Sequence, residues 1–289
     1  MDPSLARVIW HRLEAINAVT YFSPECLEAP AQLGLRGFWM GYVACRASPM
    51  GEVGAAVVEA TFFNFHPARI RRAIPDAWSY ASPRDILDAR AASAAAALRR
   101  LVSDRAAEQL AADAMPILDS AIGWAVPAGR PLFAANRDVA RPDDPVAALW
   151  QAATTLREHR SDAHVALLTG AGLDGCEVHV LFAACEDVAP QLFQNSRGWS
   201  CEDWQAAHDR LRARGLLAGD GRPTTHGREL LARIERCTDE LAASPYQRVG
   251  DEQFERLVAL LGPAAARIAA SGEIPFPNPM GLPRPSSSG

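Results

Sequence analysis

The segment from residue 197 to residue 241 restricts the possible folds of this chain more than any other. Ser200 is a favourable N-cap, and acidic residues occupy the first turn after it, where the helix dipole favours them. Apolar residues then recur at helical spacing, and Gly215 can end the helix. Asp220-Gly221 is a hairpin signal between Leu216-Leu217 and Thr224-Thr225, and a second amphipathic helix follows. This order predicts a winged helix-turn-helix.

The residues upstream complete the motif. Residues 173–181 have the pattern of a capped helix, residues 188–193 can form a short second helix, and residues 195–198 can form the turn. The run Asp209 to Leu217, followed by Asp220-Gly221 and a Thr-x-x-Gly-Arg pattern, resembles the winged-helix domain of MarR-type regulators. The resemblance implies the fold of a DNA-binding domain, whereas function must be argued from the site itself.

Five arginines are the candidate DNA contacts of this motif, since Arg is a common partner of phosphates and base edges. They are Arg197, Arg210, Arg212, Arg214 and Arg222. The recognition helix also carries three acids, Glu202, Asp203 and Asp209, which offset its arginines. Because affinity grows with each phosphate that is neutralised, the sequence predicts weak DNA binding. The alternative is a winged helix kept as a packing or dimerisation module.

Helical patterns dominate the rest of the chain, which has 289 residues and is 49% hydrophobic. We therefore expect a mainly α protein with an N-terminal helical ligand-pocket domain over residues 1–145. A winged helix-turn-helix domain with a small β-wing would follow over residues 146–270. The Pro- and Ser-rich residues 271–289 are expected to be a disordered tail. The stretch from Leu35 to Ala47 is apolar on all sides and predicts a buried helix that holds Trp39 and Tyr42.

Composition excludes several kinds of site. The chain has no lysine, which rules out Schiff-base chemistry and a phosphate-loop lysine. Its six cysteines are scattered without a C-x-x-C pair, so we expect free thiols and no metal site. The net charge of −5 gives no overall attraction to nucleic acid. The first residues lack a signal-peptide pattern and no run could span a membrane, so a cytoplasmic protein is expected, as a monomer or homodimer.

Two clusters of polar residues stand out in this apolar background. The first is Asn64 with His66, after an aromatic run, and the second is the ionisable stretch 157–164. They could be a capping histidine and a solvated helix junction, with Ser161 or Asp162 capping the next helix. They could also form one site, since these residue types move protons and bind anions. The catalytic candidates are His66, Glu158, His159, Asp162 and His164. The ligand-binding candidates are Asn64, His66, Arg157, His159, Arg160 and His164.

Longer segments extend the resemblance over nearly the whole chain. Residues 21–25, 34–42, 63–67, 129–136, 156–164 and 197–200 resemble an actinobacterial family with a C-terminal helix-turn-helix. That resemblance implies a fold and brings no assigned activity. The chain departs from the family pattern at Asn17, where the family has His, and at Ser161-Asp162-Ala163-His164, where it has Gly-Asp-Gly-His.

The leading hypothesis is a ligand-binding winged-helix protein, a transcriptional regulator with weak DNA binding whose partners are a small molecule and DNA. The alternative is an enzyme of specialised metabolism that uses His66 with the Arg157–His164 stretch, and the sequence names no cofactor.

Overall fold

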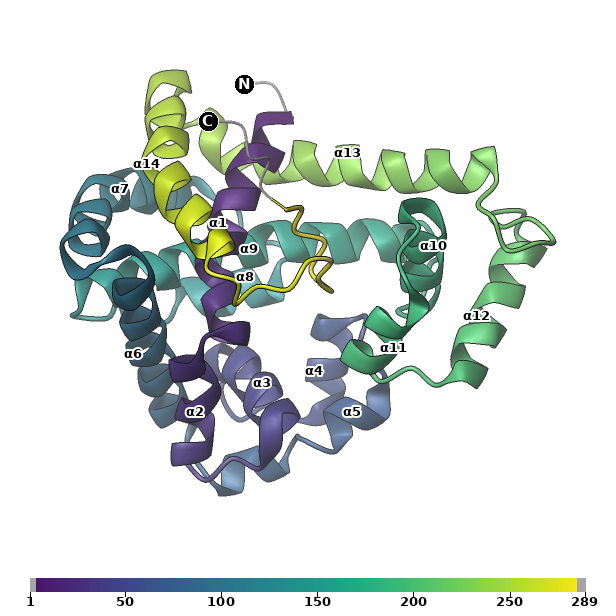
Figure 1. The fold of residues 1–289 in the computed structure, drawn as a ribbon, viewed down its shortest axis with the longest axis horizontal. Coiled ribbons are helices and arrows are strands. Elements are labelled where there is room, and N and C mark those ends of the chain that lie inside the picture. Colours follow the sequence, from purple (N-terminus) through teal and green to yellow (C-terminus); the bar gives the residue numbers. More distant parts are fainter. Residues whose placement is uncertain (1–3, 285–289) are drawn as a thin grey trace.

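The chain folds into a mainly helical molecule in which the helix-turn-helix region flanks a larger group of helices (Figure 1). A computed structural model describes residues 4–284. The helices of this range are α1 (Ser4–Phe22), α2 (Pro24–Gln32), α3 (Gly37–Ala47), η1 (Ser48–Met50), α4 (Ala55–Phe62), α5 (Pro67–Arg71), η2 (Asp76–Ser79), α6 (Pro83–Val102), α7 (Asp104–Trp124), α8 (Pro131–Arg137), α9 (Pro145–Gly170), α10 (Glu177–Glu186), α11 (Pro190–Arg197), α12 (Cys201–Ala213), α13 (Thr225–Gln247) and α14 (Asp251–Ala270). None of these helices combines the length and apolarity needed to cross a membrane.

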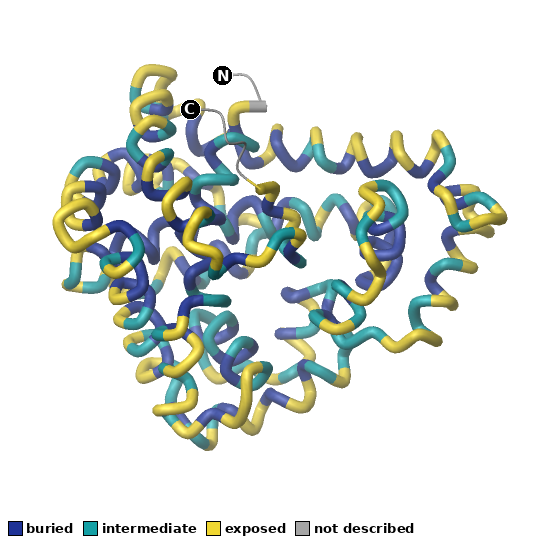
Figure 2. Tube along the Cα trace, in the orientation of Figure 1, coloured by how far each residue is buried: buried dark blue, intermediate teal, exposed yellow. Residues whose placement is uncertain are grey.

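Helix α9 runs through the middle of the molecule (Figure 1). Its first turn is fixed by Asp144, whose carboxylate accepts the N–H groups of Val146 and Ala147 at 2.8 and 3.1 Å. The following residues are mostly Ala, Thr and Leu, so α1, α6, α7, α8 and α13 can all pack closely on it. The helix is buried over most of its length as a result, from Val146 to Ala163, and its C-terminal turns are more exposed (Figure 2).

The helix break expected near residue 161 is wrong. Helix α9 continues without interruption to Gly170, so neither Ser161 nor Asp162 begins a new helix. The charged side chains of this stretch are bonded to partners on neighbouring helices, which makes their burial tolerable inside one continuous helix.

Three apolar clusters hold the fold together. The first joins α1, α6, α7, α9 and α14 and includes the fully buried Trp150. The second lies among α3, α4, α5 and α8 and includes Phe62. The third lies beneath the helix-turn-helix and includes Leu181, Leu211 and Ile234. Because α9 supplies residues to the first and third clusters, it connects the helical core to the helix-turn-helix.

The local signals of the helix-turn-helix are confirmed. Gly198, with φ of 88°, ends α11 and allows the sharp turn before α12. Ser200 and Asp203 form a capping box, in which each side chain bonds the other residue's backbone N–H. Gly215 follows α12 with φ of 68°, as expected of a helix-ending glycine.

The expected β-wing is reduced to a bare hairpin. Across it, Ala218 N–H donates to the Arg222 carbonyl at 2.8 Å and Thr224 N–H donates to Leu216 at 3.0 Å. A single antiparallel bridge joins Leu217 to Pro223, and the described residues contain no β-strand. Thr224 does not continue a return strand, because its hydroxyl instead caps α13 by accepting the Gly227 N–H.

Helix α3 is less buried than its apolar sequence predicts. Phe38 is 49% exposed, and Trp39 and Tyr42 are half-buried. The opposite face, with Val43 and Ala44, is fully buried. One apolar face of the helix packs in the second apolar cluster, and the more exposed aromatic face lines the cavities described below.

The segment after α14 lies against the helical core, where its composition predicted disorder. Ile274 and Leu282 are buried in the first apolar cluster, and the Asn278 side chain bonds both backbone groups of Leu282. We call residues 274–284 the C-terminal strap. The rest of the expected tail, residues 285–289, lies outside the described residues.

Candidate ligand-binding cavities

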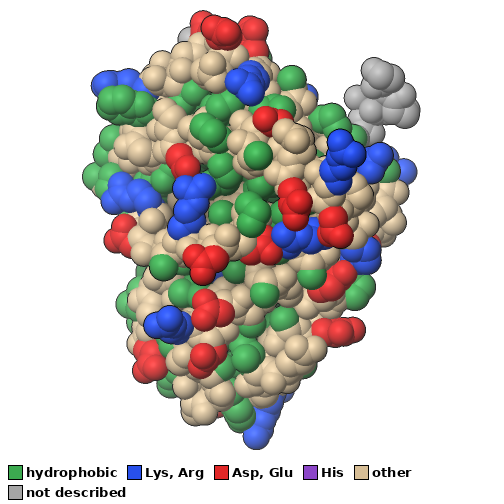
Figure 3. Space-filling view, turned by 90° about the vertical axis from the view of Figure 1, so that its left-hand side faces the viewer, with side chains coloured by type: hydrophobic (Ala, Val, Ile, Leu, Met, Phe, Trp, Pro, Cys, Tyr) green, Lys and Arg blue, Asp and Glu red, His purple; other side chains and the backbone are tan. Residues whose placement is uncertain are grey.

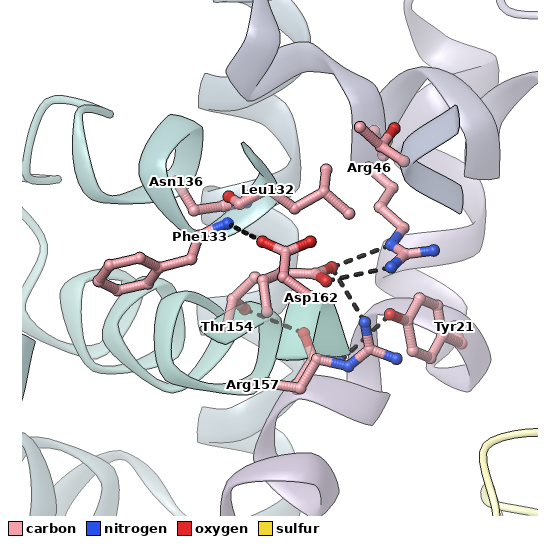
Figure 4. Close-up of polar contacts among 12 residues, drawn as sticks. Tyr21, Arg46, Leu132, Phe133, Asn136, Thr154, Arg157 and Asp162 are labelled. Carbon is pink, nitrogen blue, oxygen red and sulfur yellow. Dashed lines mark hydrogen bonds and ion pairs between the residues drawn. The ribbon is translucent and has the colours of Figure 1, made fainter. Parts of the chain in front are cut away.

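A network of four charged side chains joins α1, α3 and α9 (Figure 4). The Arg46 guanidinium donates two hydrogen bonds to the Glu158 carboxylate, at 2.9 and 3.0 Å. Arg157 bridges both acids, bonding Glu158 at 3.0 Å and Glu14 at 2.9 Å. Glu14 and Glu158 are each 1% exposed, so the pairs are shielded from water. Buried pairs of this kind are stable only when both partners are present.

The charges in this network hold one another ionised. Burial alone raises the pKa of Glu158, but Arg46 and Arg157 outweigh it and bring the pKa down to about 2. Burial likewise opposes the charge of Arg46, yet Glu158 raises the net pKa of that guanidinium. Glu158 is therefore a fixed anion and is unsuited to proton transfer near neutral pH.

A first cavity of about 360 Å³ lies beside this network. Its apolar walls come from α1, α2, α3 and α9, and its polar groups include Asn17, Arg46, Arg90 and Glu158. A volume of this size can hold a small organic molecule, and a mostly apolar wall with a few polar groups is typical of such sites.

A second cavity of about 270 Å³ adjoins the first. Tyr21, Phe38, Tyr42 and Arg46 line both cavities, so one molecule or two neighbouring molecules could occupy them. The second cavity is enclosed by three parts of the chain: the helical core, the C-terminal end of α11, and the strap. Its residues include Phe65, Arg157, His164, Arg197 and Met280.

Two buried arginines at these cavities lack a carboxylate partner. In the first cavity, Arg90 donates only to uncharged acceptors: the Cys45 carbonyl at 2.7 Å, Gln151 at 2.9 Å and Asn136 at 3.1 Å. In the second, Arg197 donates to the Pro279 carbonyl at 2.7 Å and lies 4.6 Å above the Phe65 ring. Burial lowers the pKa of both groups to about 10, and both stay charged at neutral pH.

The two cavities therefore carry an excess of positive charge. Four arginines line the cavities, and two of the four are paired with the glutamates Glu14 and Glu158. A third acid, Asp162, lies near Glu158 but lines neither cavity. Its carboxylate accepts the Phe133 N–H at 2.8 Å, and burial followed by the charge of Glu158 raises its pKa to about 7. Asp162 is thus only partly ionised at neutral pH and offsets only part of the excess.

The raised pKa of Asp162 gives a testable pH dependence. Between its ordinary value of 3.8 and about 7, the folded protein binds a proton that the unfolded chain has lost, so this group destabilises the fold as the pH rises. Asp162→Asn should gain stability relative to wild type by about 1.4 kcal/mol per pH unit in that range. Urea unfolding at about pH 5 and about pH 7 measures the change. An equal stability difference between variant and wild type at both pH values would contradict this expectation. Asp138→Asn, at an exposed position, is the control and should show no such pH dependence.

The structure does not bring His66 and His159 into contact. His66 caps α5, accepting the Ala68 N–H through Nδ1, and its ring packs against Trp199. His159 is buried beside Phe133 of α8, where burial lowers its pKa to about 3. Neither ring lines a cavity. These positions give the proposed enzyme site no support.

The other candidates divide between the cavities and a separate ion cluster. Asn64, Arg157 and His164 line the second cavity. His164 also contacts Thr238 of α13 at 3.0 Å, and burial lowers its pKa. Arg160 points away from the cavities to Glu235 and Asp239, at 3.2 and 3.1 Å. No group of His, Cys, Asp and Glu among the described residues has a metal-binding arrangement.

Most of the predicted DNA contacts are occupied within the chain. Arg197 is 8% exposed and lines the second cavity, so its guanidinium is covered in this conformation. Arg210 pairs with Asp174 and Glu177, and Arg214 bonds the carbonyls of Ala171 and Gly172.

Two predicted contacts keep a largely free guanidinium. Arg212 lies 3.7 Å from Asp209. Arg222, on the hairpin, has an 84% exposed side chain that lies 3.7 Å from Asp220. The surface of α12 is not basic, because Glu202, Gln205 and Asp209 are exposed on the same helix as Arg212.

A different face of the molecule, beside α6 and α7, has charges of both signs mixed with apolar side chains (Figure 3).

A sequence profile described as a helix-turn-helix family matches residues 6–275. The chain belongs to this helix-turn-helix family. No curated protein and no solved structure matches the chain. The matched range begins in α1 and ends at the start of the strap, so the family model covers the helical core as well as the helix-turn-helix. The likeness to MarR-type regulators and the actinobacterial origin remain predictions.

Sequence reasoning missed the cavity arginines on α3 and α6. A signal was present: Arg46 stands alone in the otherwise apolar stretch 37–47, and Arg90 precedes an alanine-rich run. A lone charge on the buried side of a helix requires a buried partner. Glu14 lies among apolar residues of α1 in the same way, which indicates a buried acid that needs a basic partner.

Proposed function

We propose that this helix-turn-helix family member binds a small apolar molecule that carries one acidic group. The observation that supports this most is the excess of buried arginine over buried carboxylate around the cavities. An uncompensated buried cation is costly, and a carboxylate or phosphate from a ligand would relieve that cost. The aromatic side chains of Tyr21, Phe38 and Tyr42 would contact the apolar body of the ligand.

A pair of matched probes tests the proposal. 2-Naphthoate and 2-naphthamide have the same two-ring body and nearly the same shape, but only the first is an anion. Isothermal titration of the full-length protein should show saturable binding of both. The carboxylate should bind about tenfold more tightly, because a charge-assisted hydrogen bond is stronger than a neutral one. Failure of both probes to bind saturably would overturn the proposal, and equal affinities would overturn the acidic group.

We further propose that the chain contacts DNA weakly, through the hairpin more than through α12. The family assignment supports DNA contact, and the exposed Arg222 supports the hairpin as the place. The internal pairing of Arg210 and Arg214 supports low affinity, because an arginine already bonded to an acid must give up that bond to reach a phosphate. A homodimer stays a prediction.

Arg222→Ala should weaken DNA binding at all sequences and lower the salt slope by about one unit, because one phosphate contact is lost. The measurement is fluorescence anisotropy on the DNA flanking the gene, over a series of salt concentrations. Arg105→Ala, an exposed arginine on α7, is the control and should change neither quantity. Absence of salt-dependent binding by the wild type at low ionic strength would contradict the DNA proposal.

A further inference from the structure

The second cavity is the place where ligand binding and the helix-turn-helix meet. Arg197 is the last residue of α11, and Ser196 beside it also lines the cavity. Pro279 and Met280 of the strap form another part of the wall, and Phe65 with α9 completes it. A molecule in this cavity would contact three segments that are far apart in the sequence.

The hydrogen bonding of Arg197 separates it from the other three arginines. Arg46 and Arg157 each donate two hydrogen bonds to glutamates, and Arg90 has three uncharged acceptors. Arg197 is as deeply buried, yet among the described residues it has one hydrogen-bond acceptor, the Pro279 carbonyl. The Nε atoms of Arg90 and Arg197 are both buried without a partner, so the two groups differ in their other nitrogens, which have three acceptors in Arg90 and one in Arg197. An unpaired donor on a buried cation is expensive, which points to a missing acceptor.

We propose that Arg197 is the ligand's anion-binding residue, and that a carboxylate bound there links α11 to the C-terminal strap. This inference rests on the proposed function and deepens it by placing the acidic group in the second cavity. The guanidinium can donate to an acid through its unpaired donors while Nη2 keeps its bond to Pro279. Binding would thereby tighten the contact between the helix-turn-helix and the strap without new protein–protein bonds.

Titration of variants with the naphthyl probes tests the assignment. Arg197→Met keeps most of the packing on Phe65 and removes the charge, so it should abolish the roughly tenfold preference for 2-naphthoate over 2-naphthamide. Arg197→Lys keeps the charge without the planar fork and should retain only part of the preference. If Arg197→Met does not fold, the lysine variant alone decides, because an undiminished preference in it overturns the assignment.

Arg69→Met is the matched control. Arg69 also stacks on an aromatic ring, that of Trp39 at 4.0 Å, and donates to an α11 carbonyl, but it lines neither cavity. The Arg69→Met variant should prefer 2-naphthoate over 2-naphthamide by the same factor as the wild type. Loss of the preference in Arg90→Met, with full retention in Arg197→Met, would overturn the assignment and leave the proposed function intact. Absence of binding to the wild type would instead overturn the proposed function itself.

Hydrogen exchange tests the proposed link. In wild type, 2-naphthoate should slow amide exchange in residues 190–198 and in the strap, and 2-naphthamide should have a smaller effect. Both effects of the carboxylate should disappear in Arg197→Met. Slowing in α2, which lines only the first cavity, without slowing in residues 190–198 or the strap, would show that the acid binds elsewhere and would overturn the inference.

Discussion

Glu158→Gln is expected to lower the free energy of unfolding by about 3–5 kcal/mol. Glutamine keeps the shape of the side chain but removes the charge that Arg46 and Arg157 both face, at 2.9–3.0 Å. Both buried guanidinium groups would then lose the negative charge that they share, an amide NH2 group would replace one of the two carboxylate oxygens, and the cavities would gain a further unbalanced positive charge. Denaturation by urea, monitored by circular dichroism, measures the loss.

Glu202→Gln, at an exposed position of α12, is the matched control and should change stability little. The double variant Arg46→Gln/Glu158→Gln should be destabilised by clearly less than the sum of the two single variants, because each single change leaves its partner unpaired. Additive losses would show that the two side chains do not depend on one another. A small loss in Glu158→Gln would show that water reaches the network.

Gly175→Ala should cost about 3 kcal/mol, near the upper end for overpacking. A Cβ atom at this position, just before α10, would lie 2.3 Å from the Phe63 carbonyl oxygen and 3.0 Å from the Asn64 Cα. Both contacts are with backbone, which cannot rotate away as a side chain could. The helix-turn-helix would have to shift from the loop that helps to line the second cavity.

Thermal unfolding measures this effect, and Gly123→Ala gives a control of opposite sign. Gly123 lies in α7 with no atom within 4 Å of its added Cβ, so alanine should stabilise that helix by about 1 kcal/mol at most. If Gly175→Ala were as stable as wild type, the close approach of α10 to residues 63–64 would not exist in solution.

The sequence predicted the helix-turn-helix well because its signals are local. Ser200 followed by Asp203, and Gly215 after α12, determine their helix ends through neighbouring backbone groups. The break predicted at residue 161 failed because the fate of a charged stretch depends on distant partners. Glu14 and Arg46, which keep that stretch inside α9, lie more than 100 positions away from it. Local patterns carry no information about such pairs.

The candidate site was only partly predictable for the same reason. Arg157, His164 and Asn64 do line a cavity, because a polar residue in an apolar background needs a special environment. His66 and His159 are also polar residues among apolar ones, but their environments lie outside the cavities. His66 caps α5, and the His159 ring packs on Phe133. Arg197 was assigned to DNA because its place in the turn suggested exposure. The strap covers it, and nothing in the local sequence shows this.

The strap also determines when the second cavity can exist during synthesis. Tyr21, which lines this cavity, leaves the ribosome more than 250 residues before Met280, which lines it too. At typical elongation rates the helices can fold well before that wall is made. A nascent chain that lacks the strap would therefore expose Arg197 to water, and the site would reach its final affinity only after the strap has been made.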